Sequence, residues 1–315
     1  MKWFSLLILL SFTVSITAQS NVSCTADRYE KDLFSHFSKQ TIEYTKTNGW
    51  QTENQSLLAD IYEPKDDTAT LRPLIILAHG GSFVGGNKEQ VASFCTNLAK
   101  KGYVAVSIQY RLIPVSKVAE SNNILREIIR AINDMKAAVR FFRQSAANGN
   151  PYKIDPNNIF IGGVSAGAIT ALHAGILDSD DKVSDELAKI IAEEGGFEGD
   201  TGSVENRKFS SKVNGVINLS GSIMDENWID KDDAPIFSYH GMEDSVVAIG
   251  YRKIGRLGLF GSESIQQKAD KVGLYNLLVK VPGGGHVDVY SPKYSIYLND
   301  FQKQLNKKIR SMICE

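Results

Sequence analysis

The stretch IFIGGVSAGAITALHAGIL at residues 159–177 decides the fold. Residues 159–162 form a short apolar run that predicts a buried strand, and residues 166–177 predict a helix. Between the two lies GVSAG, residues 163–167. This order of strand, glycine-flanked serine and helix is typical of a nucleophile elbow, in which a serine occupies a sharp turn. We therefore take Ser165 as the candidate nucleophile.

A GxSxG pattern alone is weak evidence, so its setting between a strand and a helix carries the interpretation. Gly163 and Gly167 are small enough to relieve the crowding of a tight turn. The turn then presents the Ser165 hydroxyl at the carboxyl edge of the sheet, beside the positive end of the following helix.

Apolar runs alternate with helical patterns on both sides of this stretch. We expect strands at residues 57–62, 74–78, 103–108, 159–162, 216–219, 236–239 and 277–281. We expect helices at residues 87–101, 122–147, 166–177 and 294–313. Short strands separated by helices predict an α/β fold, with a mostly parallel central sheet and helices on both faces.

The composition is that of an ordinary globular protein. The chain has 315 residues, 43% of them hydrophobic, and 35 Lys and Arg residues balance 36 Asp and Glu residues. This balance leaves no basic surface that would favour a nucleic-acid partner. The absence of repeats and biased tracts argues against a solenoid or a linker protein. We expect one catalytic domain over residues 19–315.

Residues 1–18 are predicted to be a signal peptide. Lys2 gives a positive start, an apolar run follows to Ile16, and Ala18 offers a small residue for cleavage. A membrane anchor needs about 20 apolar residues, and the polar residues from Gln19 onward come too early for one. The mature protein is therefore expected to be secreted or periplasmic, without an integral membrane anchor.

The chain has three cysteines, so at least one thiol is free or pairs outside the chain. Cys95 falls in a predicted helix, where a buried and inert thiol is expected. Cys24 and Cys314 flank the mature chain, and an oxidising compartment would allow them to form a disulfide. The sequence leaves open whether they do.

Residues 178–211 do not fit the alternation of strands and helices. The segment is acidic and rich in glycine, which predicts a helical excursion followed by a surface loop. Long insertions in compact domains are often lids, so a cap over a cleft and a solvated surface insertion both stay open.

Activation of a serine requires a base, and the chain offers five histidines. His36 lies in the N-terminal segment, and His173 lies two turns into the helix that follows Ser165. His79 and His240 remain as candidates, but His286 is favoured. It ends GGGH, residues 283–286, directly after a predicted strand, where a base would reach the carboxyl edge of the sheet.

The acid that orients the imidazole is predicted to be Asp244. It follows the predicted strand at residues 236–239. Glu243 is its neighbouring rival, and Asp288 is a weaker one because it lies close to His286 in sequence. The chain order Ser165, Asp244, His286 is that of α/β-hydrolases rather than of chymotrypsin or subtilisin.

The segment HGGSFVGG at residues 79–86 directly follows the strand predicted at residues 74–78. Its glycines let backbone amides turn inward, so the amides of Gly81, Ser82 and Ala166 are predicted to form an oxyanion hole. A phosphate-binding loop is excluded, since no GK[ST] or GxGxxG follows the strand.

Taken together, these motifs resemble those of α/β-hydrolase carboxylesterases, in the broad esterase and lipase group that includes hormone-sensitive-lipase-like and feruloyl-esterase-like enzymes. The motifs that carry the resemblance are HGGSFVGG (79–86), GVSAG (163–167), HGMEDSVV (240–247) and GGGH (283–286), with DIYEP (60–64) and YRL (110–112). The resemblance implies Ser165 as nucleophile, Asp244 as acid, His286 as base, and Gly80 and Gly81 as oxyanion donors.

Two positions depart from the pattern of this group. Ser82 stands where many members have a third glycine, and Gln109 stands where an aspartate is usual. Phe83, Tyr110 and Trp228 are either aromatic walls of a substrate pocket or members of the core.

The predicted function is hydrolysis of a small-molecule or polymer-linked carboxylic ester through an acyl-enzyme. No metal, organic cofactor or nucleic acid is implied. Two alternatives are a serine exopeptidase on the same fold and a non-catalytic binding protein. The first normally carries a propeller or large cap, for which residues 19–315 leave no space, and the second usually lacks a triad member.

Overall fold

The computed structural model describes residues 23–255 and 257–314. The predicted signal peptide lies outside the described residues. Among the residues described, no helix combines the length and the apolar character needed to span a membrane.

A central sheet of eight strands organises the fold, in the order β1-β2-β4-β3-β5-β6-β8-β11. The strands from β4 to β11 pair in parallel, whereas β1 and β2 are antiparallel to their neighbours. The mostly parallel sheet predicted from the sequence is therefore confirmed. The strands are β1 (Phe37–Thr47), β2 (Gln55–Pro64), β3 (Arg72–Ala78), β4 (Val104–Ile108), β5 (Ile154–Val164), β6 (Gly215–Leu219), β8 (Ile236–Gly241) and β11 (Asn276–Val281).

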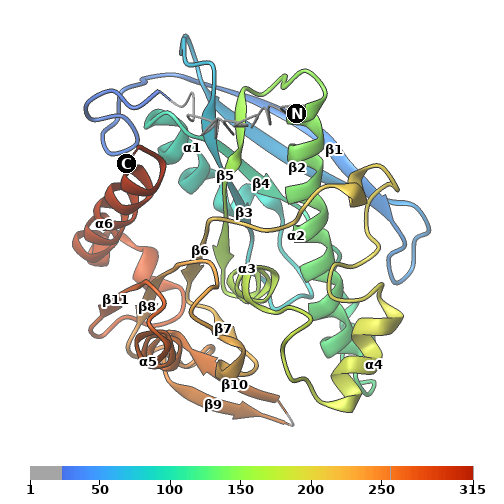
Figure 1. The fold of residues 1–315 in the computed structure, drawn as a ribbon. Coiled ribbons are helices and arrows are strands. Elements are labelled where there is room, and N and C mark those ends of the chain that lie inside the picture. The colour runs from blue at the N-terminus through green and yellow to red at the C-terminus, as the bar shows by residue number, and fades with distance from the viewer. Residues whose placement is uncertain (1–22, 256, 315) are drawn as a thin grey trace, which may run out of the picture.

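Helices cover both faces of this sheet (Figure 1). The helices α1 (Ala92–Lys100) and α6 (Ser295–Cys314) pack on one face, and α2 (Asn123–Ala147) and α3 (Ala166–Ile176) pack on the other. Side chains along a strand point alternately to the two faces. In β3, Leu74 and Ile76 accordingly join the core beneath α2 and α3, whereas Ile75 and Leu77 join the core beneath α1 and α6.

Some elements differ from the prediction. The helix expected at residues 87–101 begins as a 3-10 helix, η1 (Lys88–Val91), and becomes α-helical only at Ala92. The edge strand β1 was not predicted, because its side chains are mostly exposed and polar. A small sheet of β7 (Ser222–Ile223), β10 (Leu257–Gly261) and β9 (Tyr251–Ile254) and the helix α5 (Ser262–Val272) were also not predicted.

Residues 178–211 contain the expected helical excursion, α4 (Asp185–Glu193), followed by loops. Ion pairs fasten the segment to the outer side of α2, for example Arg126 to Glu194 at 2.7 Å and Arg130 to Glu194 at 2.9 Å. The buried Arg140 also donates to the carbonyl oxygen of Thr201 at 3.0 Å. The segment therefore lies against α2.

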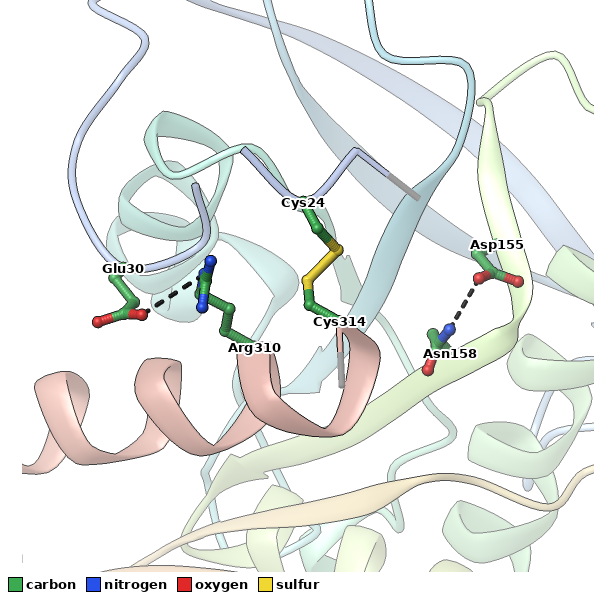
Figure 2. Close-up of a disulfide and its surroundings, with 6 residues drawn as sticks. All are labelled: Cys24, Glu30, Asp155, Asn158, Arg310 and Cys314. Carbon is green, nitrogen blue, oxygen red and sulfur yellow. Dashed lines mark hydrogen bonds and ion pairs between the residues drawn. A yellow bond between two sulfur atoms is a disulfide. The ribbon is translucent and has the colours of Figure 1, made fainter. Parts of the chain in front are cut away.

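A disulfide between Cys24 and Cys314 joins the two ends of the described chain (Figure 2). The Cα atoms of the two cysteines lie 5.7 Å apart, although 290 positions separate them in sequence. Beside the disulfide, Arg310 of α6 forms an ion pair with Glu30 at 3.6 Å. The remaining cysteine, Cys95, is buried and free, as expected from its place in α1.

Candidate active site

Ser165 lies in the turn between β5 and α3 and has the strained backbone angles φ 54° and ψ −118°. Glycines make this turn sterically feasible. A Cβ atom at Gly163 would lie 2.4 Å from the carbonyl carbon of Gly167, and one at Gly167 would lie 2.2 Å from the carbonyl oxygen of Ala78. The Ser165 amide donates to the carbonyl oxygen of Leu219 on β6 at 2.9 Å, which holds the turn against the sheet. The predicted strand, turn and helix are thus all present.

His286 lies in the loop after β11, and its Nε2 is 2.8 Å from Ser165 Oγ. Its other ring nitrogen, Nδ1, is 2.7 Å from Oδ2 of Asp244, which follows β8. A carboxylate only accepts hydrogen bonds, so Nδ1 carries the proton and Nε2 is free to accept the serine hydroxyl. The structure therefore brings together the three residues predicted as nucleophile, base and acid.

Asp244 is buried and surrounded by donors. Its Oδ1 accepts the backbone N–H groups of Val246 and Val247, each at 2.9 Å. Burial alone would raise the pKa of Asp244, but hydrogen bonds from His240, His286 and Val247 outweigh burial and lower this pKa well below its ordinary range. Asp244 therefore stays ionised at neutral pH and keeps the imidazole of His286 oriented.

Both rival carboxylates belong to exposed residues. Glu243 is exposed, and its amide donates to the carbonyl oxygen of Gly284 at 2.9 Å. Asp288 is also exposed and accepts the Gly285 amide at 2.6 Å. Neither carboxylate is the one that contacts His286.

The other histidines also lie apart from the serine hydroxyl. His36 is exposed. His173 is buried within α3, where its Nδ1 lies 2.7 Å from the carbonyl oxygen of Ile169. Burial lowers the pKa of His173 to about 4, so this imidazole is neutral at pH 7. His79 and His240 are also buried, and their Nδ1 atoms contact the Gly80 carbonyl oxygen and Ser262 Oγ rather than the serine hydroxyl.

The segment HGGSFVGG forms a tight loop beside Ser165. A Cβ atom at Gly80 would lie 3.3 Å from the Cβ of Ser165, so the two backbones are in close contact. Gly81 and Ser82 have φ of 122° and 54°, which turns the local peptide groups away from an extended path. Within the described part of the chain, the N–H groups of Gly81 and Ser82 have no protein acceptor. Such amides suit a developing oxyanion, together with the N–H of Ala166 at the start of α3.

The buried ring of His79 contacts both Tyr110 and the backbone of this loop. Its ring stacks on Tyr110 with a centroid distance of 4.5 Å, and its Nδ1 lies 2.7 Å from the Gly80 carbonyl oxygen. Burial lowers the pKa of His79, which favours the neutral ring at pH 7. Tyr110 also donates its hydroxyl to the carbonyl oxygen of His79 at 2.9 Å. These contacts fix the position from which the loop turns.

Ser165 opens onto a cavity of about 480 Å³. One part of its wall is polar and contains Ser82, Gln90 and Ser93. The apolar and aromatic residues in its lining are Val91, Phe94, Val164, Val246, Val287 and Tyr290. Val246 and Val287 are 49% and 76% exposed, so the mouth of the cavity is open to solvent.

The aromatic residues considered as pocket walls lie elsewhere. Phe83 and Tyr110 are buried in the core beneath α2 and α3. Trp228 is also buried, and it lines a separate cavity near α4. The aromatic side chains at the Ser165 cavity are instead Phe94 and Tyr290, which no sequence motif marked.

Residues 59–225 match the BD-FAE family. The chain is 29% identical over 196 residues to the probable carboxylesterase 3 of Arabidopsis thaliana, covering 60% of this chain and 59% of that protein. The chain spans less than two thirds of the length of the first curated relatives that it matches.

Two solved structures show the same fold. A thermophilic esterase from Thermogutta terrifontis, solved with propionate bound, superposes with a TM-score of 0.63 at 19% identity, over 87% of this chain and 94% of that chain. A truncated carbohydrate esterase from gut microbiota superposes with a TM-score of 0.60 at 24% identity, over 88% and 98% of the two chains. These matches confirm the predicted α/β-hydrolase fold and the predicted resemblance to esterases.

Proposed function

The chain belongs to the BD-FAE family, and on this premise we propose that it is a serine carboxylesterase with Ser165 as nucleophile, His286 as base and Asp244 as acid. The observation that carries the proposal is the unbroken line of contacts from Asp244 Oδ2 through His286 to Ser165 Oγ, at 2.7 and 2.8 Å. The lowered pKa of Asp244 supports an ionised acid, and the order of the contacts is the one that acyl transfer requires.

In the first half of the reaction, Ser165 Oγ attacks the ester carbonyl carbon as His286 Nε2 accepts the hydroxyl proton. The resulting oxyanion accepts hydrogen bonds from the N–H groups of the Gly80 to Ser82 loop and of Ala166. When the tetrahedral intermediate collapses, His286 gives its proton to the departing alcohol. Water repeats the cycle on the acyl-enzyme and releases the acid.

The substrate is a carboxylic ester, either a small molecule or one linked to a polymer. The open mouth of the cavity supports access for a bulky alcohol portion, and its apolar wall suits an acyl chain or an aromatic acid. Carboxylesterase and carbohydrate esterase are the names given to two of the similar proteins. Nitrophenyl esters of increasing length, acetylated xylan and methyl ferulate are the substrates to compare.

We also propose that the protein works outside the cytoplasm, in the periplasm or after secretion. The pattern of residues 1–18 supports export. The Cys24–Cys314 disulfide supports it independently, since such bonds persist mainly in oxidising compartments. Detection of the mature protein starting after Ala18 in an exported fraction would test this part.

The decisive experiment labels the protein with a fluorophosphonate and measures intact mass. One adduct on Ser165, absent from Ser165→Ala, is expected together with loss of p-nitrophenyl acetate hydrolysis. Hydrolysis without an adduct would reject the serine mechanism. An aminoacyl-nitroanilide cleaved faster than the ester would favour an exopeptidase, and inactivity on both would favour a binding protein.

A further inference from the structure

A second imidazole reaches the carboxylate of Asp244. His240 is fully buried on β8, and its Nε2 lies 3.3 Å from Asp244 Oδ2 and 2.9 Å from the carbonyl oxygen of Val247. Its Nδ1 lies 2.7 Å from Oγ of Ser262, the first residue of α5. His240 therefore connects the acid of the site to a helix on the far side of β8.

The direction of these hydrogen bonds is fixed by a backbone amide. The N–H of Gly221 donates to Oδ1 of Asn218 at 2.9 Å, so this side-chain atom is the amide oxygen. The amide nitrogen of Asn218 must then face the other way. It donates to Ser262 Oγ at 2.9 Å and to Ser238 Oγ at 3.0 Å.

The same logic fixes the tautomer of His240. Ser262 accepts from Asn218 and keeps its own hydroxyl proton to donate to His240 Nδ1. The Val247 carbonyl can only accept, so His240 Nε2 must carry the ring proton. In the neutral ring this N–H is shared between the Val247 carbonyl and Asp244 Oδ2.

Four N–H groups thereby contact the two carboxylate oxygens of Asp244. Two backbone N–H groups hold Oδ1, and His286 and His240 approach Oδ2 at 2.7 and 3.3 Å. Val247 takes part twice, since its N–H donates to Asp244 and its carbonyl accepts from His240. Rotation of the carboxylate would break several of these contacts, so the network fixes the plane in which His286 is oriented.

We propose that His240 is a positioning residue for the reaction of Ser165, acting through Asp244. The proposal rests on the proposed esterase function. His240 does not contact the serine hydroxyl. Its ring is held by Ser262, which is itself held by the Asn218 amide, and its Nε2–H contacts the carboxylate of Asp244. In this way His240 keeps the carboxylate aligned with His286.

The experiment compares His240→Met with His240→Gln in the full mature protein. Met fills a similar volume without an N–H, whereas the Gln amide can place a donor near the position of Nε2. We expect His240→Met to lower kcat for p-nitrophenyl acetate about ten- to a hundredfold, the order expected for loss of one hydrogen bond to a charged group, with KM within about twofold. His240→Gln should recover most of this loss. Dividing the maximal rate by the concentration of fluorophosphonate-titrated sites gives a kcat that is free of the contribution of unfolded protein.

His173→Met is the matched control, because His173 is equally buried and its ring is also hydrogen-bonded at both nitrogens, to Ile169 and Met224. It should leave kcat per titrated site within about twofold of wild type. Ser262→Ala, which removes the partner of His240 Nδ1 without altering the imidazole, should lower kcat less than His240→Met. If His240→Met does not fold, Ser262→Ala tests the same network, and an unchanged kcat would then contradict the positioning role.

A proton NMR spectrum gives a readout that does not depend on turnover. The His286 Nδ1–H hydrogen-bonded to Asp244 should give a downfield resonance in wild type, His240→Gln and His173→Met, and a shifted or broadened one in His240→Met. Wild-type kcat per site in His240→Met, or an equal loss in His173→Met, would overturn the positioning role. If wild type hydrolyses no ester and takes no label, the esterase proposal fails. The NMR comparison still tests His240 in that case, because an unchanged His286 Nδ1–H resonance in His240→Met would show that His240 does not position Asp244.

Discussion

The rings of Phe94 and Tyr290 meet edge to face, with their centroids 6.1 Å apart, in the wall of the cavity beside Ser165. Phe94 comes from α1, and Tyr290 comes from the loop that also supplies His286. Phe94 in addition borders a second, apolar cavity of about 30 Å³, which Leu219 and Phe301 also line. Phe94 thus lies between the cavity at Ser165 and an apolar cavity between α1 and α6.

Phe94→Ala is expected to lengthen the acyl chains that the protein accepts, because it joins these two cavities. The ratio of kcat/KM for p-nitrophenyl decanoate to that for the butyrate should rise about tenfold, the order of one to two well-buried methylene groups. Phe141→Ala is the matched control, since Phe141 is also half-buried and meets Phe142 edge to face, but lies on α2. An unchanged chain-length profile in Phe94→Ala would show that acyl chains bind elsewhere.

Asp244→Asn is expected to lower kcat about 10⁴-fold with little change in KM, because the amide favours the wrong imidazole tautomer of His286. Glu243→Gln and Asp288→Asn, at the two exposed rival positions, should stay within about twofold of wild type. The measurement is steady-state hydrolysis of p-nitrophenyl acetate. Inactivation by Glu243→Gln with an active Asp244→Asn would reverse the assignment of the acid.

Gly81→Ala should lower kcat about a hundredfold or more by displacing the oxyanion donors. A Cβ at Gly81 would lie 2.0 Å from the carbonyl oxygen of Gly85, so the loop cannot keep its path. Gly149 also has a positive φ, but a Cβ there meets nothing within 4 Å. Gly149→Ala should therefore cost some stability and leave kcat unchanged, which separates backbone strain from loss of the donors.

Glu127 on α2 is expected to make the stability of the protein depend on pH. Its side chain is fully buried, its Oε2 accepts the indole N–H of Trp50, and its Oε1 has no partner among the described residues. Burial, only partly offset by the Trp50 hydrogen bond, raises the pKa of Glu127 from 4.5 to about 7. Between these pH values the folded chain holds a proton that the unfolded chain has released.

The free energy of unfolding should therefore fall as the pH rises from about 4.5 to 7, by up to about 3 kcal/mol from this residue. Glu127→Gln, which mimics the protonated form, should lose this part of the pH dependence and be more stable than wild type above pH 7. Urea unfolding at a series of pH values measures both slopes. If the free energy of unfolding changed with pH in the same way in both proteins, the raised pKa of Glu127 would be contradicted.

Reduction of the Cys24–Cys314 disulfide should destabilise the protein by about 2–5 kcal/mol, because the bond closes nearly the whole chain in the unfolded state. The Cys24→Ser, Cys314→Ser double variant should show the same loss and no further response to reductant. Cys95 is buried and free, so titration of the unfolded, unreduced wild type should find one thiol. Finding three thiols would exclude the bond.

The arrangement of Ser165, Asp244 and His286 was predictable because each follows a strand. Carboxyl ends of parallel strands meet at one edge of a sheet, so residues just after β5, β8 and β11 are brought together there. The apolar runs that mark these strands are strong signals in sequence. Apolar patterns likewise predicted seven of the eight strands of the described central sheet and the helices α1, α2, α3 and α6.

The wall of the cavity could not be predicted in this way. Phe94 and Tyr290 reach it because α1 packs next to the loop after β11, and neither lies in a recognisable motif. The contact of His240 with Asp244 depends on the path of residues 244–247, which turns back over β8. Strand β1 was missed because only Tyr44 on it is buried, so its sequence lacks an apolar face.

The bond between Cys24 and Cys314 closes residues 24–314 into a covalent ring. A protease that cuts once in an exposed loop between them would open the ring without releasing a fragment. The two pieces of the nicked protein, heavier by one water molecule in total, would stay joined until a reductant is added. Because Cys24 and Cys314 lie side by side, a short peptide could join these two positions while new ends are opened in the loops of residues 178–211, away from the residues that line the cavity at Ser165.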